Sequence, residues 1–332
     1  MSFFAILFAL LIEQVRPLAR QNPIHALLRV WARWVSKNFD AGKPHHGWVA
    51  WTLAVAVPAV VATGVHLVLL RFLGWPFAML WSILVLYATL GFRQFSHHFT
   101  AIRDALDAGD EQQARVLLAD WQRVDAVQLP RSEVVRHVIE YSVLAAHRHV
   151  FGVLAWFSIL AALGLGPAGA VLYRLAEFVT RYWPHRNLSG VQPVSTSLQT
   201  ASARAWHALD WVPARITAVG FAVVGSFEEA IDCWRHHAQR FPNDNDGVVL
   251  AATSGAIGVR LGGEALRSAY ASPTAQALHA PAPPSATFLD SESTPGREAE
   301  VGHLRSVVGL VWRSVVLWMV LLALLTLARL LG

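Results

Sequence analysis

Apolar residues gather in long blocks along the chain, and polar or basic stretches separate the blocks. The clearest block, residues 48–70, is long enough for a helix to cross a bilayer core of about 30 Å. Residues 75–92 form a second block after a short turn, so we expect the two helices to form an antiparallel hairpin. Residues 3–12 predict a retained first membrane helix, because no small-residue cleavage motif follows them, and residues 306–331 predict a last one.

Two central blocks cannot be assigned from length alone. Residues 150–179 are long for one crossing and contain GLGPAG, which favours two short helices around a break over one tilted, kinked helix. Residues 212–225 are apolar but short for a crossing. The number of crossings in both blocks stays open at this stage.

The segment between residues 93 and 149 predicts a helical hairpin. Its apolar residues recur at three- and four-residue spacing, stop at the sequence AGD, and then resume. We expect Asp110 to be the N-cap of the second helix. The segment looks locally like one tetratricopeptide unit, but a single unit cannot bury its own apolar face. We therefore expect the helical pair to pack on the membrane domain.

The basic residues predict the orientation of the membrane helices. Residues 13–47 contain six Lys or Arg and residues 93–149 contain seven, whereas the turn at 71–74 has only Arg71. Because cytoplasmic loops are enriched in Lys and Arg, we expect both basic segments in the cytoplasm and the amino terminus outside. A bacterial inner (cytoplasmic) membrane and several crossings follow from this interpretation.

These patterns divide the chain into five predicted parts. Residues 271–302 are rich in Ala, Pro and Ser, can bury little apolar surface, and predict a flexible linker. The predicted parts are the N-terminal membrane helices with a basic loop (1–92), the cytoplasmic helical segment (93–149), a core with broken membrane helices (150–270), this linker (271–302) and a C-terminal transmembrane helix (303–332).

Composition places the chain in the membrane class. The 332 residues are 55% hydrophobic and 15% charged, with 14 Trp and a mean hydropathy of +0.41. One cysteine, Cys233, excludes an intrachain disulfide framework. The net charge is +5, but no basic cluster or stripe appears, so we expect the lipid bilayer as partner and no nucleic acid. The predicted fold class is an all-α, polytopic integral membrane protein with a cytoplasmic helical hairpin.

No local motif predicts a metal or phosphate site. The 15 histidines include adjacent pairs, which do not share a helix face, and HExxH is absent. The glycines of residues 256–265 match neither GxGxxG nor GxxxxGK[ST]. We expect no metal ligands and no certain cofactor, and the spacing assigns no catalytic residue.

Four stretches together resemble the CobD/CbiB family of cobalamin-biosynthesis membrane proteins. They are VLYRLAEF (171–178), LDWVPARITA (209–218), RFPNDNDGV (240–248) and AIGVRLGG (256–263), and the resemblance covers residues 133–263 best. It implies an amide ligase that attaches an aminopropanol arm to a corrinoid carboxyl group, with ATP and Mg²⁺ as implied cofactors. The layout is closer to AmpE-type inner-membrane proteins, which are associated with β-lactamase regulation and share the LDWVP form, the hairpin and a linker before a last span.

Departures from the family pattern concern the acidic residues. Glu140 is retained, but Leu144, Ala145 and Arg148 follow where the family has further polar positions. Glu177 and Thr180 stand where asparagine and aspartate are expected, and the amino-terminal acid motif is reduced to Glu13. Because Mg²⁺ and phosphates need hard oxygen ligands, we expect these changes to remove ligase activity.

Two interpretations of the polar stretch at 209–218 stay open. In the first, Asp210 caps a helix that begins near Pro213, and Arg215 pairs with Asp210 or Glu177 at the interface. In the second, the family positions line a pocket for a corrinoid or another anionic small molecule. The candidate ligand-binding residues are Glu140, Tyr173, Arg174, Glu177, Asp210, Arg215, Asn243 and Arg260.

The functional expectation from the sequence is an AmpE-like regulatory or ligand-sensing protein of the inner membrane, with a membrane-protein partner. The alternative is a cobalamin biosynthesis protein of the adenosylcobinamide-phosphate synthase type, which joins aminopropanol or its phosphate to cobyric acid. Only this alternative implies ATP and Mg²⁺.

Overall fold

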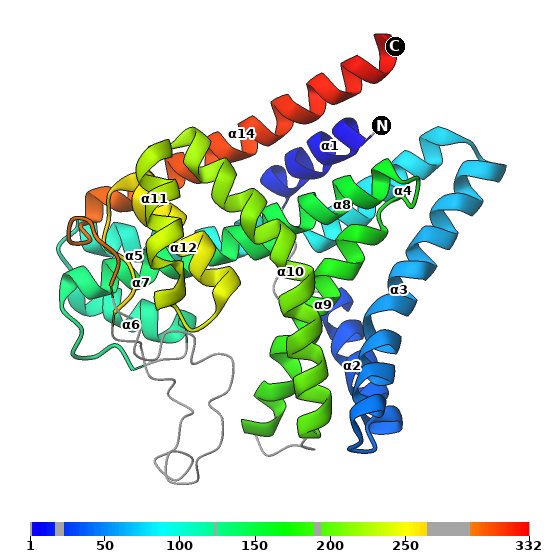
Figure 1. The fold of residues 1–332 in the computed structure, drawn as a ribbon, viewed down its shortest axis with the longest axis horizontal. Coiled ribbons are helices and arrows are strands. Elements are labelled where there is room, and N and C mark those ends of the chain that lie inside the picture. Colours follow the sequence, from blue (N-terminus) through cyan, green and yellow to red (C-terminus); the bar gives the residue numbers. More distant parts are fainter. Residues whose placement is uncertain (1, 17–22, 123–124, 189–193, 264–292, 332) are drawn as a thin grey trace. The chain divides into compact units, whose positions relative to one another are not determined.

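The computed structural model describes residues 2–16, 23–122, 125–188, 194–263 and 293–331, and the elements named in these ranges are all helices. Contacts divide the chain into two compact units. Unit 1 comprises residues 1–94, 148–213 and 319–332, and unit 2 comprises residues 95–147 and 214–318. Figure 1 shows the helices, coloured along the sequence from blue at the amino terminus to red at the carboxyl terminus. Residues 264–292, which include most of the predicted linker, lie outside the described residues.

Among the described residues, three helices are long and apolar enough to cross a membrane by length and composition: Pro44–Phe72, Arg131–Ala162 and Val301–Ala328. The first contains the predicted span at 48–70, and the last covers residues 306–328 of the predicted span at 306–331. Two shorter apolar helices, α1 (Ser2–Val15) and α4 (Trp75–Thr89), occupy the other predicted blocks. The sequence did not lead us to expect a candidate span at Arg131–Ala162, because its first half is polar.

Unit 1 contains the amino-terminal helices α1, α2 (Pro23–Phe39), α3 (Pro44–Phe72) and α4. α3 and α4 are joined by a tight turn and pack against each other, as expected for a hairpin (Figure 1). The turn is made at Gly74, whose φ of 90° lies in the left-handed region that favours glycine. The Trp81 indole N–H donates to the Ala62 carbonyl across this pair (3.1 Å).

Unit 1 also contains α8 (Gly152–Ala162), α9 (Ala168–Leu188) and the first part of α10 (Thr196–Val224). The helical structure is interrupted between α8 and α9 at residues 163–167, where the glycines and proline of GLGPAG predicted a break. The two helices pack closely, because a Cβ on Gly169 would lie 1.9 Å from the Trp156 carbonyl oxygen. This close approach explains the glycine two residues after Pro167.

α10 corrects the expected start of a helix near Pro213. The helix begins at Thr196, so Pro213 lies inside it and Asp210 is not an N-cap. Proline removes the N–H that would bond the carbonyl four residues earlier. The indole N–H of Trp156 donates to that carbonyl, on Leu209, at 2.9 Å. The interior proline is therefore accommodated by a donor from α8.

The same arrangement occurs at Pro58 inside α3. The carbonyl four residues earlier belongs to Ala54, and the indole N–H of Trp31 on α2 donates to it at 3.2 Å. Both prolines thus have a tryptophan from a neighbouring helix that replaces the lost hydrogen bond.

Unit 2 contains the predicted hairpin, formed by α5 (Phe92–Asp107), most of which lies in this unit, and α6 (Glu111–Gln122). The Asp110 carboxylate accepts a hydrogen bond from the Gln113 N–H at 2.9 Å, which confirms the predicted N-cap. Arg115 of α6 donates to the Leu129 carbonyl just before α7 (Arg131–Ala146), and α6 packs on α7. One π-turn, His147–Phe151, links α7 to α8 without a break.

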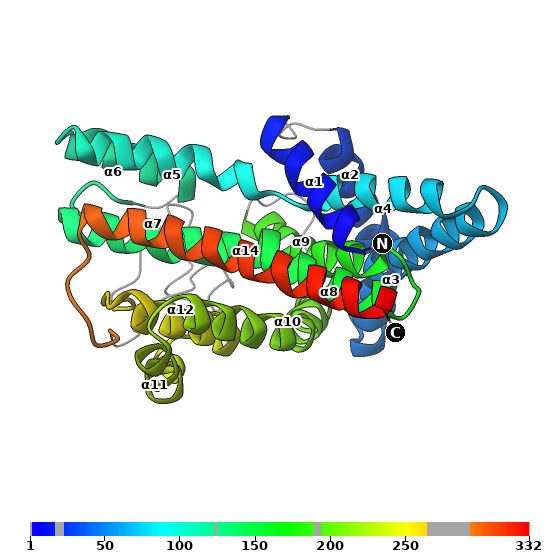
Figure 2. The ribbon, with the colours of Figure 1, turned by 90° about the horizontal axis from the view of Figure 1, so that it is seen from above.

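The rest of unit 2 is built on a pair of crossing helices, α11 (Phe227–His237) and α12 (Asp244–Ile257), joined by a 3-10 turn (Figure 2). The helices meet closely at Gly255, where a Cβ would lie 2.2 Å from the Glu229 carbonyl oxygen. α12 also packs on α7. The last helix, α14 (Val301–Leu331), begins in unit 2.

Candidate functional site

Tyr173 of α9 and Asp210 of α10 form a buried hydrogen-bonded pair in unit 1. The Tyr173 hydroxyl donates to Asp210 Oδ1 at 2.6 Å, and neither residue is exposed to solvent. The ring of Trp206 lies 5.0 Å from the Tyr173 ring. On the side of α8, Gly152 leaves room for the ring, because a Cβ there would lie 2.1 Å from it. Two predicted site residues thus meet in a tightly packed environment.

Arg174 and Glu177, one helical turn apart on α9, form an ion pair at 2.6 Å. Arg181 approaches the second carboxylate oxygen of Glu177 at 2.8 Å. Two guanidinium groups therefore hold this buried carboxylate. Both Glu177 oxygens bind arginines of its own helix, and the expected pairing of Glu177 with Arg215 stays a prediction.

Glu140 of α7 lies at the centre of a charged cluster in unit 2. Its Oε1 atom accepts a hydrogen bond from Arg136 at 3.0 Å and one from the backbone N–H of Gly262 at 2.7 Å. The Nδ1 atom of His137 lies 3.5 Å from the other oxygen, and Arg136 also binds Glu133. Since carboxylate and guanidinium are both buried, the pair anchors the AIGVRLGG stretch to α7.

The RFPNDNDGV stretch forms the start of α12. Asn243 is the N-cap and accepts a hydrogen bond from the Asn245 N–H at 3.3 Å. The Asn245 side chain accepts one from Arg215 at 3.1 Å. Asp246 is buried beside it in the first turn. Of these residues, the sequence singled out Asn243 and Arg215.

Residues 293–297 are bonded along the AIGVRLGG stretch. The N–H of Arg260 donates to the Arg297 carbonyl (2.8 Å), and the Arg297 N–H donates to the Gly258 carbonyl (3.0 Å). Thr294 is buried, and its hydroxyl accepts from the Leu261 N–H at 2.8 Å and lies 2.6 Å from the Ser254 hydroxyl. The prediction of a flexible linker is therefore wrong for residues 293–302, because Thr294 supplies the hydrogen bonds that the glycine-rich stretch lacks.

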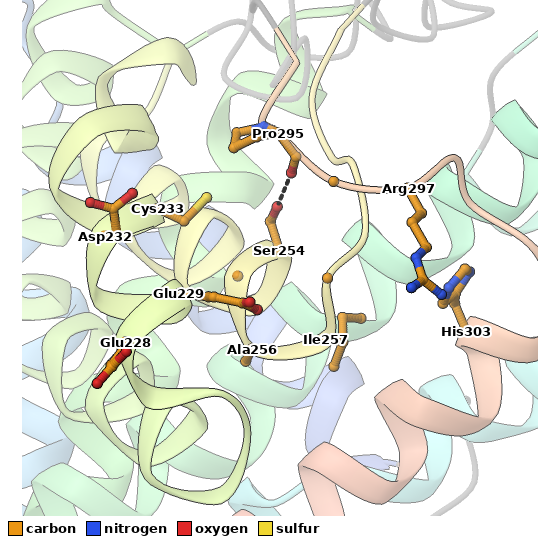
Figure 3. Close-up of a pocket in the computed structure, with 13 residues that line it drawn as sticks. Glu228, Glu229, Asp232, Cys233, Ser254, Ala256, Ile257, Pro295, Arg297 and His303 are labelled. Carbon is orange, nitrogen blue, oxygen red and sulfur yellow. Dashed lines mark hydrogen bonds between the residues drawn. The ribbon is translucent and has the colours of Figure 1, made fainter.

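A cavity of about 780 Å³ lies between α11, the end of α12 and residues 295–297 (Figure 3). Acidic residues of α11 line one side, with the Glu229 carboxylate directed toward the middle of the view, and Arg297 and His303 lie on the other side. The acidic residues are Glu228, Glu229 and Asp232. Burial raises the pKa of the Cys233 thiol, so this group stays protonated at neutral pH and is a poor nucleophile. The cavity can accept a molecule that carries both a positive and a negative group.

The donor set of the described residues does not fit a protein-held metal ion. Within these ranges no three His, Cys, Asp or Glu side chains lie close enough to hold one. The buried carboxylates of Glu140 and Glu177 are bound by arginines, which neutralise the charge that Mg²⁺ would need. We therefore derive no step through Mg²⁺ or a nucleotide.

The structure distributes the eight predicted site residues over both units. Unit 1 holds two pairs, Tyr173 with Asp210 and Arg174 with Glu177. In unit 2, Glu140 binds the stretch that carries Arg260, whose side chain is exposed. Sequence analysis missed Arg136, Asn245 and Asp246, and it also missed the residues of α11, Arg297 and His303 that line the cavity. Asn245 and Asp246 stood in a quoted family stretch, and their position in a first helical turn could have marked them.

Comparison with known proteins finds a match to the family model described as "CobD/Cbib protein" over residues 3–288. A cobalamin biosynthesis protein CobD from Stutzerimonas stutzeri is 31% identical over 326 residues, which cover 96% of each chain. Proteins of the same name from Chromobacterium violaceum (34% over 183 residues, 55% of each chain) and Mycobacterium tuberculosis H37Rv (29% over 216 residues, 64% of this chain and 65% of the relative) are also similar. No solved structure matches. These findings support the cobalamin interpretation and give no support to the AmpE-like regulatory one.

Proposed function

Because this chain belongs to the CobD/CbiB family, we propose that it is a membrane-bound cobalamin biosynthesis protein that joins aminopropanol, or its phosphate, to a carboxyl group of cobyric acid. The observation that carries the proposal is the similarity to a protein named CobD over nearly the full length of both chains. We place the protein in the bacterial inner membrane with its basic segments in the cytoplasm, where the Lys and Arg distribution favours them.

The loss of family acids was the reason to expect an inactive relative, and the structure weakens that reason. Glu140, Glu177, Asp210 and Asp246 are all buried. Burying a carboxylate is costly unless partners compensate for the lost hydration. Three of the four have partners of defined geometry: Arg136 and a backbone N–H for Glu140, two arginines for Glu177, and Tyr173 for Asp210. The chain therefore keeps buried acidic residues with defined partners, although their positions differ in part from the family pattern.

The cavity in unit 2 suits the smaller of the two substrates. At neutral pH an amino alcohol phosphate carries an ammonium group and a phosphate. We assign the phosphate to Arg297 and His303, and the ammonium group to the carboxylates of α11. Arg260 is exposed on the adjoining stretch and is the candidate contact for a carboxylate of the corrinoid. These residues bind and orient the substrates.

Amide formation from a free carboxylate needs an activating group, which ATP supplies in the reaction that the family resemblance implies. The described residues do not offer a Mg²⁺ cage, and Mg²⁺ often reaches a site with substrate phosphates and only one or two protein carboxylates.

The test is growth of a bacterial strain that lacks its own CobD on a medium where growth depends on cobalamin made from cobyric acid. Expression of the chain restores growth if the proposal holds. Arg297→Gln weakens growth at low aminopropanol supply, and extra aminopropanol restores it, because the variant loses a substrate contact. The control is Arg235→Gln, an exposed arginine of α11 outside the cavity, which grows as the wild type. Absence of growth with a folded, membrane-inserted wild-type chain contradicts the proposal.

A further inference from the structure

The outward face of α2 carries a row of large apolar side chains. Ile24, Leu27, Val30 and Trp34 are 39%, 68%, 53% and 49% exposed, and their spacing of three, three and four residues places them along one side of the helix. The side chain of Trp34 is stacked on Trp31, with ring centroids 5.3 Å apart. A row of this length is unusual on a surface in contact with water alone.

A basic row runs beside the apolar one, so the statement from the sequence that no basic stripe occurs is wrong for this helix. Arg29, Arg33 and Lys37 follow at intervals of four residues and are exposed, and α2 contains no acidic residue. Within the described part of the chain, none of the three has an ion-pair partner. Three cations therefore stand next to an apolar row with no internal anion to neutralise them.

The opposite face of α2 is held in place, so the two rows cannot turn inward. Ala32 and Val35 are buried. The Trp31 indole N–H donates to the Ala54 carbonyl of α3, and the Trp183 indole N–H donates to the Ala32 carbonyl (3.3 Å). These contacts fix the rotation of α2 about its own axis.

The position of α2 along α3 indicates what covers the outward face. α3 has 29 residues, so at 1.5 Å per residue it exceeds a hydrocarbon core of about 30 Å, and one end must extend beyond the core. The end with Lys43, Trp48 and Trp51 has the composition of the headgroup level. Trp31 contacts α3 at Ala54, near that end. α2 therefore lies beside the part of α3 where hydrocarbon meets headgroups.

We propose that the outward face of α2 is a binding surface for anionic phospholipids, with the apolar row in contact with acyl chains and Arg29, Arg33 and Lys37 in contact with headgroup phosphates. The pairing of an apolar row with a basic row is typical of helices at the membrane interface. Basic side chains near an anionic lipid surface each strengthen binding by roughly fivefold. The surface shares no residue with the cavity proposed for substrate.

The experiment uses the full chain reconstituted in vesicles of phosphatidylcholine, or of an equal mixture of phosphatidylcholine and phosphatidylglycerol, in which one lipid carries brominated acyl chains. Brominated lipid quenches nearby tryptophan fluorescence. The Trp34 signal is the difference between the wild type and Trp34→Phe. We expect brominated phosphatidylglycerol to quench Trp34 at least threefold more efficiently than brominated phosphatidylcholine in the same mixture. The difference should shrink at high salt.

In the variant Arg29→Gln/Arg33→Gln/Lys37→Gln, the two brominated lipids should quench the Trp34 fluorescence equally. The matched control, Arg103→Gln/Arg235→Gln/Arg305→Gln, removes three charges from the other unit, of which Arg235 and Arg305 are exposed and Arg103 is half-buried, and should keep the preference. Thermal unfolding of each variant in detergent shows that the fold is kept. Equal quenching by both lipids in the wild type overturns the proposal. Absence of quenching also overturns it, and then points to cover by a second copy of the chain.

Discussion

Glu140 connects a helix to a backbone loop through charges that solvent does not reach. Its carboxylate accepts hydrogen bonds from Arg136 and from the Gly262 N–H, and both ionic partners are buried. Removing one partner of a buried ion pair strongly destabilises the folded state, because the other charge remains buried without a counter-charge. The stability of unit 2 should therefore depend on this carboxylate.

We predict that Glu140→Gln lowers the free energy of unfolding by about 3 kcal/mol. The control is Glu133→Gln, which removes the other carboxylate that binds Arg136 but whose side chain is 36% exposed. That variant should cost less than about 1 kcal/mol. Thermal or denaturant unfolding in detergent micelles measures both. Equal losses in the two variants would contradict the assignment of Glu140 as the buried anchor.

Two aspartates show what sequence reasoning can and cannot predict about single residues. Asp110 was assigned as an N-cap from a local pattern, and the structure confirms it because capping involves only the next few residues. Asp210 was assigned to the same role because Pro213 follows it, and this was wrong. The helix continues through Pro213 because the Trp156 indole donates to the Leu209 carbonyl. Trp156 belongs to another helix, so this contact could not be recognised from the sequence around Pro213.

Helix α10 exists as one element because a donor from α8 compensates for its proline. Without the Trp156 indole, the Leu209 carbonyl would be left with no helical partner. With alanine at position 213, a backbone N–H becomes available to that carbonyl. The contribution of Trp156 should therefore depend on whether residue 213 is proline.

We predict a coupling of about 1 kcal/mol between Trp156→Phe and Pro213→Ala in a double-mutant cycle of unfolding free energies. Trp156→Phe destabilises the wild type more than it destabilises the Pro213→Ala variant, because the new N–H takes over the Leu209 carbonyl. Trp31→Phe with Pro58→Ala should show the same coupling in α3. The mismatched pair, Trp156→Phe with Pro58→Ala, should be additive. Additivity in all three cycles would show that the indole N–H groups do not replace the hydrogen bonds that the prolines remove.

The elements themselves were largely predictable where they are locally encoded. The long apolar run of α3, the break at GLGPAG and the α5–α6 hairpin follow from periodicity, glycine and proline. The first part of α10 was missed because residues 196–209 mix Ala, Ser and Thr without a clear apolar face. The order of residues 293–302 was missed because Thr294 acts on a stretch more than thirty positions earlier, through tertiary contacts that composition does not reveal.

At the level of the whole chain, the family resemblance identified more of the candidate site residues, and more of the function, than the chemistry of single residues did. The family stretches were recognised, and the pairings Tyr173–Asp210 and Arg174–Glu177 bring together residues taken from those stretches. Arg136 lies four residues before Glu140, a helical spacing that could have marked this pair. The contact of Glu140 with the Gly262 N–H and the cavity beside α11 depend on how distant segments pack, so they could not be derived from spacing. The preference for an AmpE-like regulator came from weighing lost acids more heavily than retained ones.

The full chain in detergent or nanodiscs, supplied with cobyric acid, aminopropanol phosphate and ATP, provides the most direct measurement. Mass spectrometry of the corrinoid fraction detects formation of the amide. We predict an ATP-dependent product in which the mass of cobyric acid rises by that of aminopropanol phosphate less one water, together with little product from Arg297→Gln at low amine concentration. No such product from folded protein, with each substrate and ATP at saturating concentration, would contradict the proposed ligase activity.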